Sequence, residues 1–272
     1  MSGLKSNVIR GFKAAIARSY VRVKGGNREP SWLVWEVFLP LLMISSVVYT
    51  YQNLNAPREF VGFVILGGAM MSFWFNVLWG MGSVMYWERE RGNLEIFIVT
   101  GAPLYGLLLG MALGGMLNTT IRALAIILIG VFVFNAYFNP VGIPGAILIF
   151  ILTLAALYSL GLSLASIYLM YARSGWRASE LLSEPMMFIS GMYYPITVFP
   201  FLLQLIASLF PLAIGIDGIR RCLVLGSSIN SLIWHITMLV IMTVVLLWIG
   251  LKILRYMEMR ARREGRLILR WI

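Results

Sequence analysis

Charged residues gather in one ten-residue segment of an otherwise apolar chain. Residues 86–95, YWERERGNLE, include five charged side chains, although only 12% of all residues are charged. Charge-free runs flank these charges on both sides, at residues 60–87 and 96–121. Charges of both signs at a short turn can orient a bound protein at the rim of an interface, or brace the neighbouring helices. This segment is therefore the first candidate for contact with a partner.

Composition excludes two other kinds of chemistry. Cys222 is the sole cysteine and His235 the sole histidine, so an intrachain disulfide and a Cys/His metal cluster are both impossible. No G-x-x-x-x-G-K-[ST] loop occurs, and no glycine is followed directly by lysine. We therefore expect no ATP hydrolysis, metal or cofactor in this chain, which is predicted not to be an enzyme.

Two ionisable residues, Glu36 and Arg122, fall inside apolar segments. A charge within a membrane is costly, so each is a candidate pathway residue. The alternative for each is structural pairing, or extension of the side chain to the headgroup region. Counted from the starts of their segments, the two residues are expected at different depths. An ion pair between them is therefore not predicted.

Methionine and aromatic side chains crowd two of the apolar segments. Met71 and Phe75 lie in one, and Met187 and Met192 lie in the other. Soft and aromatic side chains suit an adaptable apolar pathway, so these four residues are candidates for lining it. They suit helix packing and lipid-facing surfaces equally well.

The elements that position these residues are predicted to be membrane-spanning helices. Mean hydropathy is +0.85, and apolar runs recur that are long enough to cross a hydrocarbon core about 30 Å thick. We therefore predict an all-α membrane protein with six transmembrane helices, joined in part by a polar loop at residues 172–180. The helices are expected at residues 31–51, 59–85, 103–134, 146–171, 181–194 and 229–253.

An amphipathic helix is predicted ahead of the first span, within residues 1–28. Apolar residues recur at steps of three and four from Leu4 to Val23, and basic residues lie mostly elsewhere. Such a helix typically lies in the membrane interface, and the alternative is a basic tail that only satisfies charge rules. The predicted transmembrane domain covers residues 29–256. Residues 257–272 are predicted to form a basic cytoplasmic tail at the membrane surface.

The segment before the last span, residues 195–224, is apolar but interrupted by proline and glycine. Broken apolar segments fit short helices that dip into the membrane edge and are buried against protein. We predict a re-entrant outer segment, held together by an acidic and a basic residue through local pairing or helix capping. Its candidate functional residues are Pro195, Pro200, Pro211, Asp217 and Arg220.

Basic residues predict the orientation. Of the 22 Lys and Arg residues, 18 fall on the side that holds both termini and residues 86–95, three fall on the other, and Arg122 lies within a span. Basic residues concentrate on the cytoplasmic side of membrane proteins. Both termini are therefore predicted to be cytoplasmic, in a multi-pass protein of the cell (inner) membrane. The net charge of +11 is attributed to contact with membrane lipid and not to nucleic acid.

Three motifs, in this order, resemble the ABC type-2 export permeases. ERERGNLE, at residues 88–95, resembles the family's acidic–Arg–Glu–x–Gly–Thr–Leu–Glu segment, with Asn93 where threonine is common. GMYYPITVFP, at residues 191–200, resembles its Gly–aromatic–x–Pro segment. FPLAIGIDGIR, at residues 210–220, resembles its Pro–Leu–…–Asp–x–x–Arg segment. With six predicted spans and a leading helix, the resemblance covers nearly the whole chain.

This resemblance implies the permease subunit of an ATP-binding-cassette exporter. Residues 88–100 would form the coupling helix that contacts a separate cytoplasmic ATPase subunit, with apolar side chains filling a groove on that subunit. ATP and Mg²⁺ would be bound by the ATPase, and a second permease subunit, identical or different, would complete a dimer. The coupling residues would be Glu88, Arg89, Glu90, Gly92, Leu94, Glu95 and Phe97.

The leading hypothesis is ATP-driven export of an amphipathic or hydrophobic substrate, drug-like or lipid-like. Export of a lipid-linked polysaccharide is an alternative that would need a wide polar groove, for which these spans offer little lining. An ion-coupled secondary transporter would place broken spans at the bilayer midplane, whereas the breaks here cluster near the outer end of the fifth span. A membrane scaffold is the remaining alternative, distinguished by the absence of a co-purifying ATPase.

Overall fold

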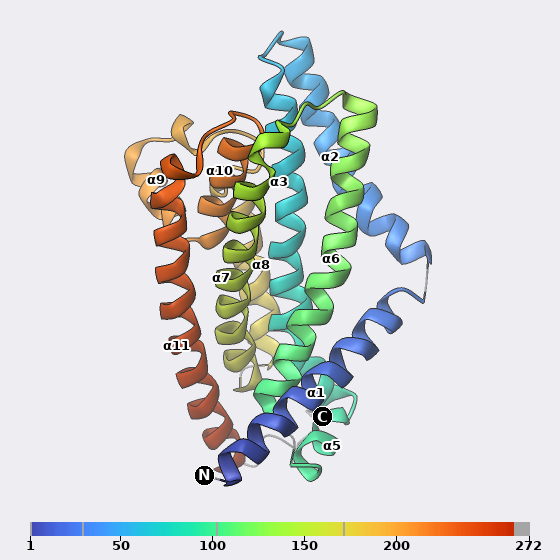
Figure 1. Cartoon of the computed structure of the whole chain (residues 1–272). Coiled ribbons are helices and arrows are strands. Elements are labelled where there is room, and N and C mark those ends of the chain that lie inside the picture. Colours follow the sequence, from blue (N-terminus) through green and yellow to red (C-terminus); the bar gives the residue numbers. More distant parts are fainter. Residues whose placement is uncertain (1, 29, 102, 171, 264–272) are drawn as a thin grey trace.

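A computed structural model shows a bundle of long helices (Figure 1). It describes residues 2–28, 30–101, 103–170 and 172–263. Every regular element in these ranges is helical, which confirms the all-α prediction. The α-helices are α1 (Ser2–Gly26), α2 (Pro30–Asn53), α3 (Glu59–Phe75), α4 (Val84–Glu90), α5 (Asn93–Val99), α6 (Leu104–Phe134), α7 (Ile143–Met170), α8 (Ala172–Ile189), α9 (Phe201–Ser208), α10 (Pro211–Leu223) and α11 (Ile233–Arg263). A π-helical segment, η1 (Asn76–Gly82), follows α3, and the 3-10 turns are η2 (Pro140–Gly142), η3 (Ile196–Val198) and η4 (Ile229–Leu232).

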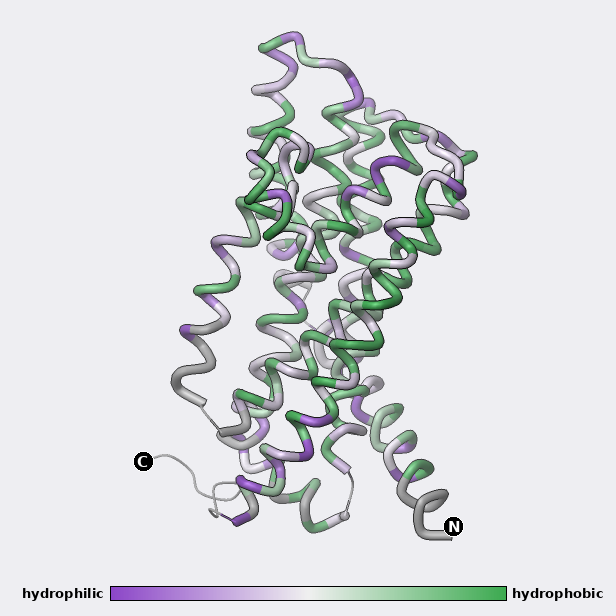
Figure 2. The backbone as a smooth tube through the Cα atoms, turned by 90° about the vertical axis from the view of Figure 1, so that its left-hand side faces the viewer, coloured by the Kyte–Doolittle hydropathy of each residue, from purple (hydrophilic) through white to green (hydrophobic). Residues whose placement is uncertain are grey.

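Five helical segments in the described ranges are long and apolar enough to cross a membrane. They are Val34–Asn53, Glu59–Glu88, Leu104–Phe134, Pro140–Tyr168 and Ile229–Ala261. A sixth span is counted if α9 and α10, which are bent by 100° at their junction, are taken together. Figure 2 shows that hydrophobic residues dominate the central turns of the long helices. The chain is therefore built as a multi-pass membrane protein.

Helix α8 corrects the predicted fifth span and the predicted loop before it. Residues 172–180 are helical, and α8 ends at Ile189 rather than near residue 194. Because it carries Arg177, Glu180 and Glu184, α8 is too polar to count among the candidate membrane spans. Its residues Ser183 and Met186 are buried. The polar residues lie on one side of an amphipathic helix, so polar composition was mistaken for a loop.

The core is centred on α3, whose residues 61–71 are all buried together with Phe73 and Trp74. A helix that is apolar on every side is expected inside a bundle. By contrast, α2 and α11 lie at the periphery, since less than a fifth of their most apolar windows is buried. The continuation of α3, η1, is also central, because it contacts α6, α7 and α8.

Helix α1 packs lengthwise against α6, in parallel orientation (Figure 1). Small residues at four-residue steps line this contact: Gly11, Ala15 and Ser19 on α1, and Gly106, Gly110 and Gly114 on α6. A Cβ atom on Gly110 would lie 2.5 Å from the Ala15 carbonyl oxygen. Small side chains let helix backbones approach closely in membrane proteins. The apolar residues of α1, among them Phe12 and Ile16, are exposed on its other side.

The two ends of the bundle differ. The described start of α1, helices α4 and α5, and the end of α11 lie at one end, and α9 and α10 lie at the other (Figure 1). We call these the α5 end and the α10 end. The predicted topology places the same segments together, with residues 86–95 on the side of the termini.

Candidate functional site

Helices α4 and α5 form a short hairpin at one end of the bundle. Gly92 separates them, with a φ of 74° in the left-handed region that favours glycine. Gly101, with a φ of 64°, follows α5 just before α6 begins. The hairpin therefore joins η1 directly to α6. These two elements pack against each other and against α7, and α6 also packs against α1 and α2.

Glu88 is the buried polar centre of this hairpin. Its side chain is 2% exposed and forms an ion pair with Arg18 of α1. The Asn93 amide donates a hydrogen bond of 3.0 Å to the second carboxylate oxygen of Glu88. A buried carboxylate needs such partners, because its desolvation is costly. Glu88 thus fixes the hairpin to α1.

The apolar side chains of the hairpin divide into two groups. Phe97 is partly buried and packs against the core. Leu94 is fully buried and therefore has no surface to offer to a groove on another protein. The expectation that Leu94 would enter such a groove is therefore corrected. Ile96 and Val99, at 62% and 87% exposure, face away from the bundle. The side chains of Arg89, Glu90 and Glu95 lie outside the described residues.

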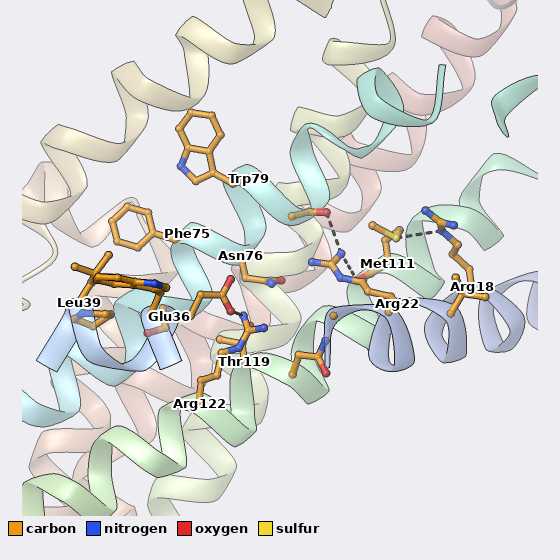
Figure 3. Close-up of a pocket in the computed structure, with 18 of the residues that line it drawn as sticks. Arg18, Arg22, Glu36, Leu39, Phe75, Asn76, Trp79, Met111, Thr119 and Arg122 are labelled. Carbon is orange, nitrogen blue, oxygen red and sulfur yellow. Dashed lines mark hydrogen bonds and ion pairs between the residues drawn. The ribbon is translucent and has the colours of Figure 1, made fainter. Parts of the chain in front are cut away.

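A cavity of about 920 Å³ opens between α1, α2, α6 and η1 (Figure 3). Its wall is mixed, with arginines and one glutamate beside aromatic and aliphatic side chains. The polar lining includes Arg18, Arg22, Glu36, Asn76, Asn118, Thr119 and Arg122. The apolar lining includes Val21, Trp35, Leu39, Phe75, Trp79 and Met111. A second, smaller hollow of about 230 Å³ shares Arg18, Arg22 and Met111 with it and includes Glu88. The two hollows therefore connect the cavity to the hairpin.

Glu36 and Arg122 form an ion pair inside this cavity, so the prediction that they would not pair is wrong. The prediction took α2 to start at the membrane surface. Instead, α1 climbs along α6, and Asn27 at its end hydrogen-bonds Asn118 of α6 at 3.3 Å. Helix α2 therefore starts partway along α6, and Glu36 reaches the level of Arg122.

Arg22 connects α1 to η1 and α6. One guanidinium nitrogen donates to the carbonyl oxygen of Gly80 at 2.9 Å and to that of Met111 at 2.8 Å (Figure 3). π-Helical turns are frequent at functional sites, and here η1 carries Asn76, Trp79 and Gly80 into the cavity wall. Burial is the main cause that lowers the pKa of Arg22 to about 10, with the charges of Arg18 and Arg122 acting in the same direction. Arg22 thus remains a cation at neutral pH.

The cavity contains only part of the predicted pathway lining. Phe75, Glu36 and Arg122 belong to it. Met71 is buried in the core, and Met192 is buried against Gly68 of α3. Met187 is half-buried on α8 and packs against the core. The predicted second span, residues 59–85, therefore contributes to this wall through residues of α3 and η1, among them Phe75, Asn76, Trp79 and Gly80. The rest of the lining comes from α1, α2, α6 and Arg91, and none of the described residues of the predicted fifth span is part of it.

At the α10 end, Arg220 holds the turn that follows α8. Its guanidinium is buried and donates to the carbonyl oxygens of Phe63 and Met192, each at 2.7 Å, and also to that of Gly191. The carbonyl of Tyr193 accepts from Tyr51 at 2.9 Å. Backbone that is not helical at membrane depth must find such partners within the protein. Arg220 and Tyr51 supply them.

Asp217 has a different role from Arg220, although the two were predicted to act together. Its carboxylate pairs with Arg221 at 2.7 Å, one turn along α10. The same oxygen contacts the His235 ring nitrogen on α11 at 2.8 Å. Asp217 therefore ties α10 to the last helix. Pro195 and Pro200 stand directly before η3 and α9, and Pro211 is the first residue of α10. Proline is tolerated at these positions because no helical hydrogen bond is lost.

Comparison with known protein families identifies the class of membrane protein to which these features belong. Residues 10–224 match the family described as ABC-2 type transporter, which covers most of the chain and includes the hairpin, the cavity and the outer segment. The chain belongs to the ABC-2 type transporter family. A search of curated proteins gave no match.

Membership makes this ABC-2 protein the transmembrane component of a transporter, in a family that works with an ABC ATPase. It confirms the resemblance drawn from residues 88–95, 191–200 and 210–220, all of which lie within the matched region. Arg18 and Arg22 were missed by sequence reasoning. Their four-residue spacing on one side of α1 was the available signal, but the basic residues of this segment were treated only as a feature of an interfacial helix.

Proposed function

We propose that this ABC-2 protein is the permease subunit of an exporter that is driven by ATP hydrolysed on a separate ATPase subunit. The observation that carries the proposal is the buried Glu88–Arg18 pair in a chain of this family. This pair links the exposed hairpin at the α5 end to α1, and α1 packs along α6. A displacement of the hairpin is therefore passed to two walls of the cavity.

The proposed contact with the ATPase is made by Ile96 and Val99. Both are exposed on α5, where an apolar surface facing water is unfavourable unless it is covered. Leu94, on the same helix, anchors α5 to the core. A short helix with one buried and one exposed apolar side can transmit a push from a docked protein without melting. ATP and Mg²⁺ are bound by the ATPase subunit in this proposal.

The proposed substrate is amphipathic or hydrophobic. The mixed wall of the cavity of about 920 Å³ supports this, because the aromatic side chains of Trp35 and Phe75 and several charged groups line the same hollow. Two permease subunits, identical or different, form the complete transporter, with the α5 end in the cytoplasm and the complex in the cell (inner) membrane. The basic residues near both termini support that orientation.

Purification from the native membrane tests this function. A tagged chain is expected to retain an ABC ATPase, and inside-out vesicles are expected to accumulate an amphipathic fluorescent dye only when ATP is hydrolysed. Dissipating ion gradients with ionophores should leave the initial rate unchanged. Uptake that follows an ion gradient and ignores ATP would instead identify a secondary transporter, and absence of any ATPase would favour a scaffold.

A further inference from the structure

The cavity between α1, α2, α6 and η1 carries an excess of positive charge. Four arginines and one glutamate line it: Arg18, Arg22, Arg91, Arg122 and Glu36. Arg18 is neutralised by Glu88 outside the cavity, and Arg122 is paired with Glu36. Arg22 donates to two backbone carbonyls and has no acidic partner among the residues that the structure describes. An anion entering the cavity would therefore meet an uncompensated cation.

Two polar groups in the same wall lack hydrogen-bond partners within the described residues. The Thr119 hydroxyl is buried, in a residue that is 2% exposed, and the Nε of Arg122, three residues further along α6, is buried as well. A helical threonine normally donates to the carbonyl four residues earlier, as the adjacent Thr120 does to Met116 at 2.7 Å. Thr119 does not do so. A buried polar atom without a partner is destabilising, so this site is built to receive a hydrogen-bonding group.

The opposite wall is apolar and reaches the surface of the bundle. Trp35 and Leu39 of α2 line the cavity and are also more than half exposed at the outside of the helix. Phe75 and Trp79 continue the apolar wall inward from there. This arrangement gives a hydrocarbon chain a path from the membrane side of α2 to the arginines.

We propose that this cavity binds an anionic amphiphile. Arg22, Arg122 and Thr119 contact its phosphate or carboxylate head group, and the wall formed by Trp35, Leu39, Phe75 and Trp79 covers its hydrocarbon tail. The inference rests on the proposed function and deepens it, because it names the charge class of the cargo. The volume of about 920 Å³ is within the range of small-molecule sites, which is roughly 300–1,000 Å³.

Other ligand classes fit these groups less well. A cationic amphiphile would be repelled by Arg22 and would compete with Arg122 for the single glutamate, Glu36. A purely apolar ligand would leave the Thr119 hydroxyl and the Arg122 Nε without partners. Inorganic phosphate would satisfy the polar groups but leave the aromatic wall uncovered.

The test measures equilibrium binding to the full chain in phosphatidylcholine nanodiscs, without an ATPase, so that its result is independent of coupling. The ligands are dodecyl phosphate, dodecyl maltoside, dodecyltrimethylammonium and inorganic phosphate. Dodecyl phosphate is expected to bind about tenfold or more tightly than each of the others, because it alone supplies both the charge-assisted hydrogen bonds and the tail.

Matched variants locate the site. Thr119→Val is expected to weaken dodecyl phosphate binding about threefold to tenfold, and its control Thr120→Val, whose hydroxyl is already bonded within α6, is expected to change nothing. The double variant Glu36→Gln/Arg122→Gln removes a whole ion pair without stranding either charge and should weaken binding about tenfold. It carries the test if Thr119→Val does not fold.

Three results would overturn the proposal. The first is equal affinity for dodecyl phosphate and dodecyl maltoside, and the second is wild-type affinity in folded Thr119→Val and double variants. The third is inorganic phosphate binding as tightly as dodecyl phosphate, which would make the ligand free phosphate. ATP-dependent dye uptake that persists alongside any of these results would leave the exporter function standing, whereas loss of ATP dependence would remove the exporter function by itself.

Discussion

Glu88 of the α4–α5 hairpin is bound to Arg18 of α1 across 70 positions of sequence. Both side chains are largely excluded from solvent. Removing one partner of a buried pair leaves an uncompensated charge, which typically costs about 3–5 kcal/mol. The pair therefore connects the hairpin firmly to α1.

Glu88→Gln is expected to uncouple ATP hydrolysis from export. The exposed Ile96 and Val99 remain in place, so the ATPase should still co-purify, while vesicle uptake falls about tenfold or more relative to hydrolysis. Arg18→Met should behave in the same way. In the double variant Arg18→Met/Glu88→Gln the loss of thermal stability should be smaller than the sum of the two single losses. Strictly additive losses would show that the two residues act independently.

The close packing of α1 on α6 makes a sharp prediction for two glycines. Gly110→Ala places a Cβ 2.5 Å from the Ala15 backbone oxygen, whereas Gly25→Ala meets nothing within 4 Å. Overpacking of this kind costs about 1–3 kcal/mol. Thermal unfolding in detergent should therefore show a lower midpoint for Gly110→Ala and an unchanged midpoint for Gly25→Ala. Equal midpoints would mean that α1 does not pack on α6 as described.

The turn at residues 191–194 should depend on Arg220 far more than on Arg221. Arg220→Lys keeps the charge but cannot reach the same set of carbonyls, since lysine lacks the planar fork of donors. Losing two charged hydrogen bonds is expected to cost about 3 kcal/mol or more. Arg221→Lys affects a half-exposed pair with Asp217 and should cost under about 1 kcal/mol. The unfolding midpoints of the two variants measure this difference, and a larger effect at Arg221 would contradict the assignment.

The sequence was sufficient for the helical class and for most long helices. The predicted third span, residues 103–134, corresponds closely to α6, because apolar runs bounded by proline and by a turn leave little choice. The family could also be predicted, because the motif ERERGNLE can be read from the sequence without knowing where each helix begins or ends. Helix α8 was only partly predicted, because its polar and apolar residues alternate with helical periodicity and its composition resembles a loop.

The cavity could not be predicted, because it depends on where one helix begins relative to another. The Glu36–Arg122 pair forms only because α1 runs along α6 and raises the start of α2. Likewise, Leu94 and Ile96 are apolar residues two positions apart, and periodicity alone did not predict that Leu94 would be buried and Ile96 exposed. The π-helical turn at η1 has no simple signature in the sequence, although Gly80 and Gly82 lie within it.

Cysteine labelling tests the predicted orientation. In a Cys222→Ser background, Arg58→Cys at the α10 end should react with a membrane-impermeant reagent added to intact cells. Arg91→Cys and Arg177→Cys should react only after the membrane is opened. All three native residues are exposed, so a failure to react reports the side of the membrane and not burial. External labelling at Arg91 would reverse the orientation inferred from the basic residues.

Site-specific photo-crosslinking tests most directly whether the ATPase docks on the hairpin. Val99 and Val141 are matched probes, because they are 87% and 85% exposed and lie at opposite ends of the bundle. A benzophenone side chain at Val99 is expected to capture the ABC ATPase in native membranes, and the same group at Val141 is expected to capture none. Capture from Val141 but not from Val99 would contradict the proposal that α4 and α5 couple this permease to its motor.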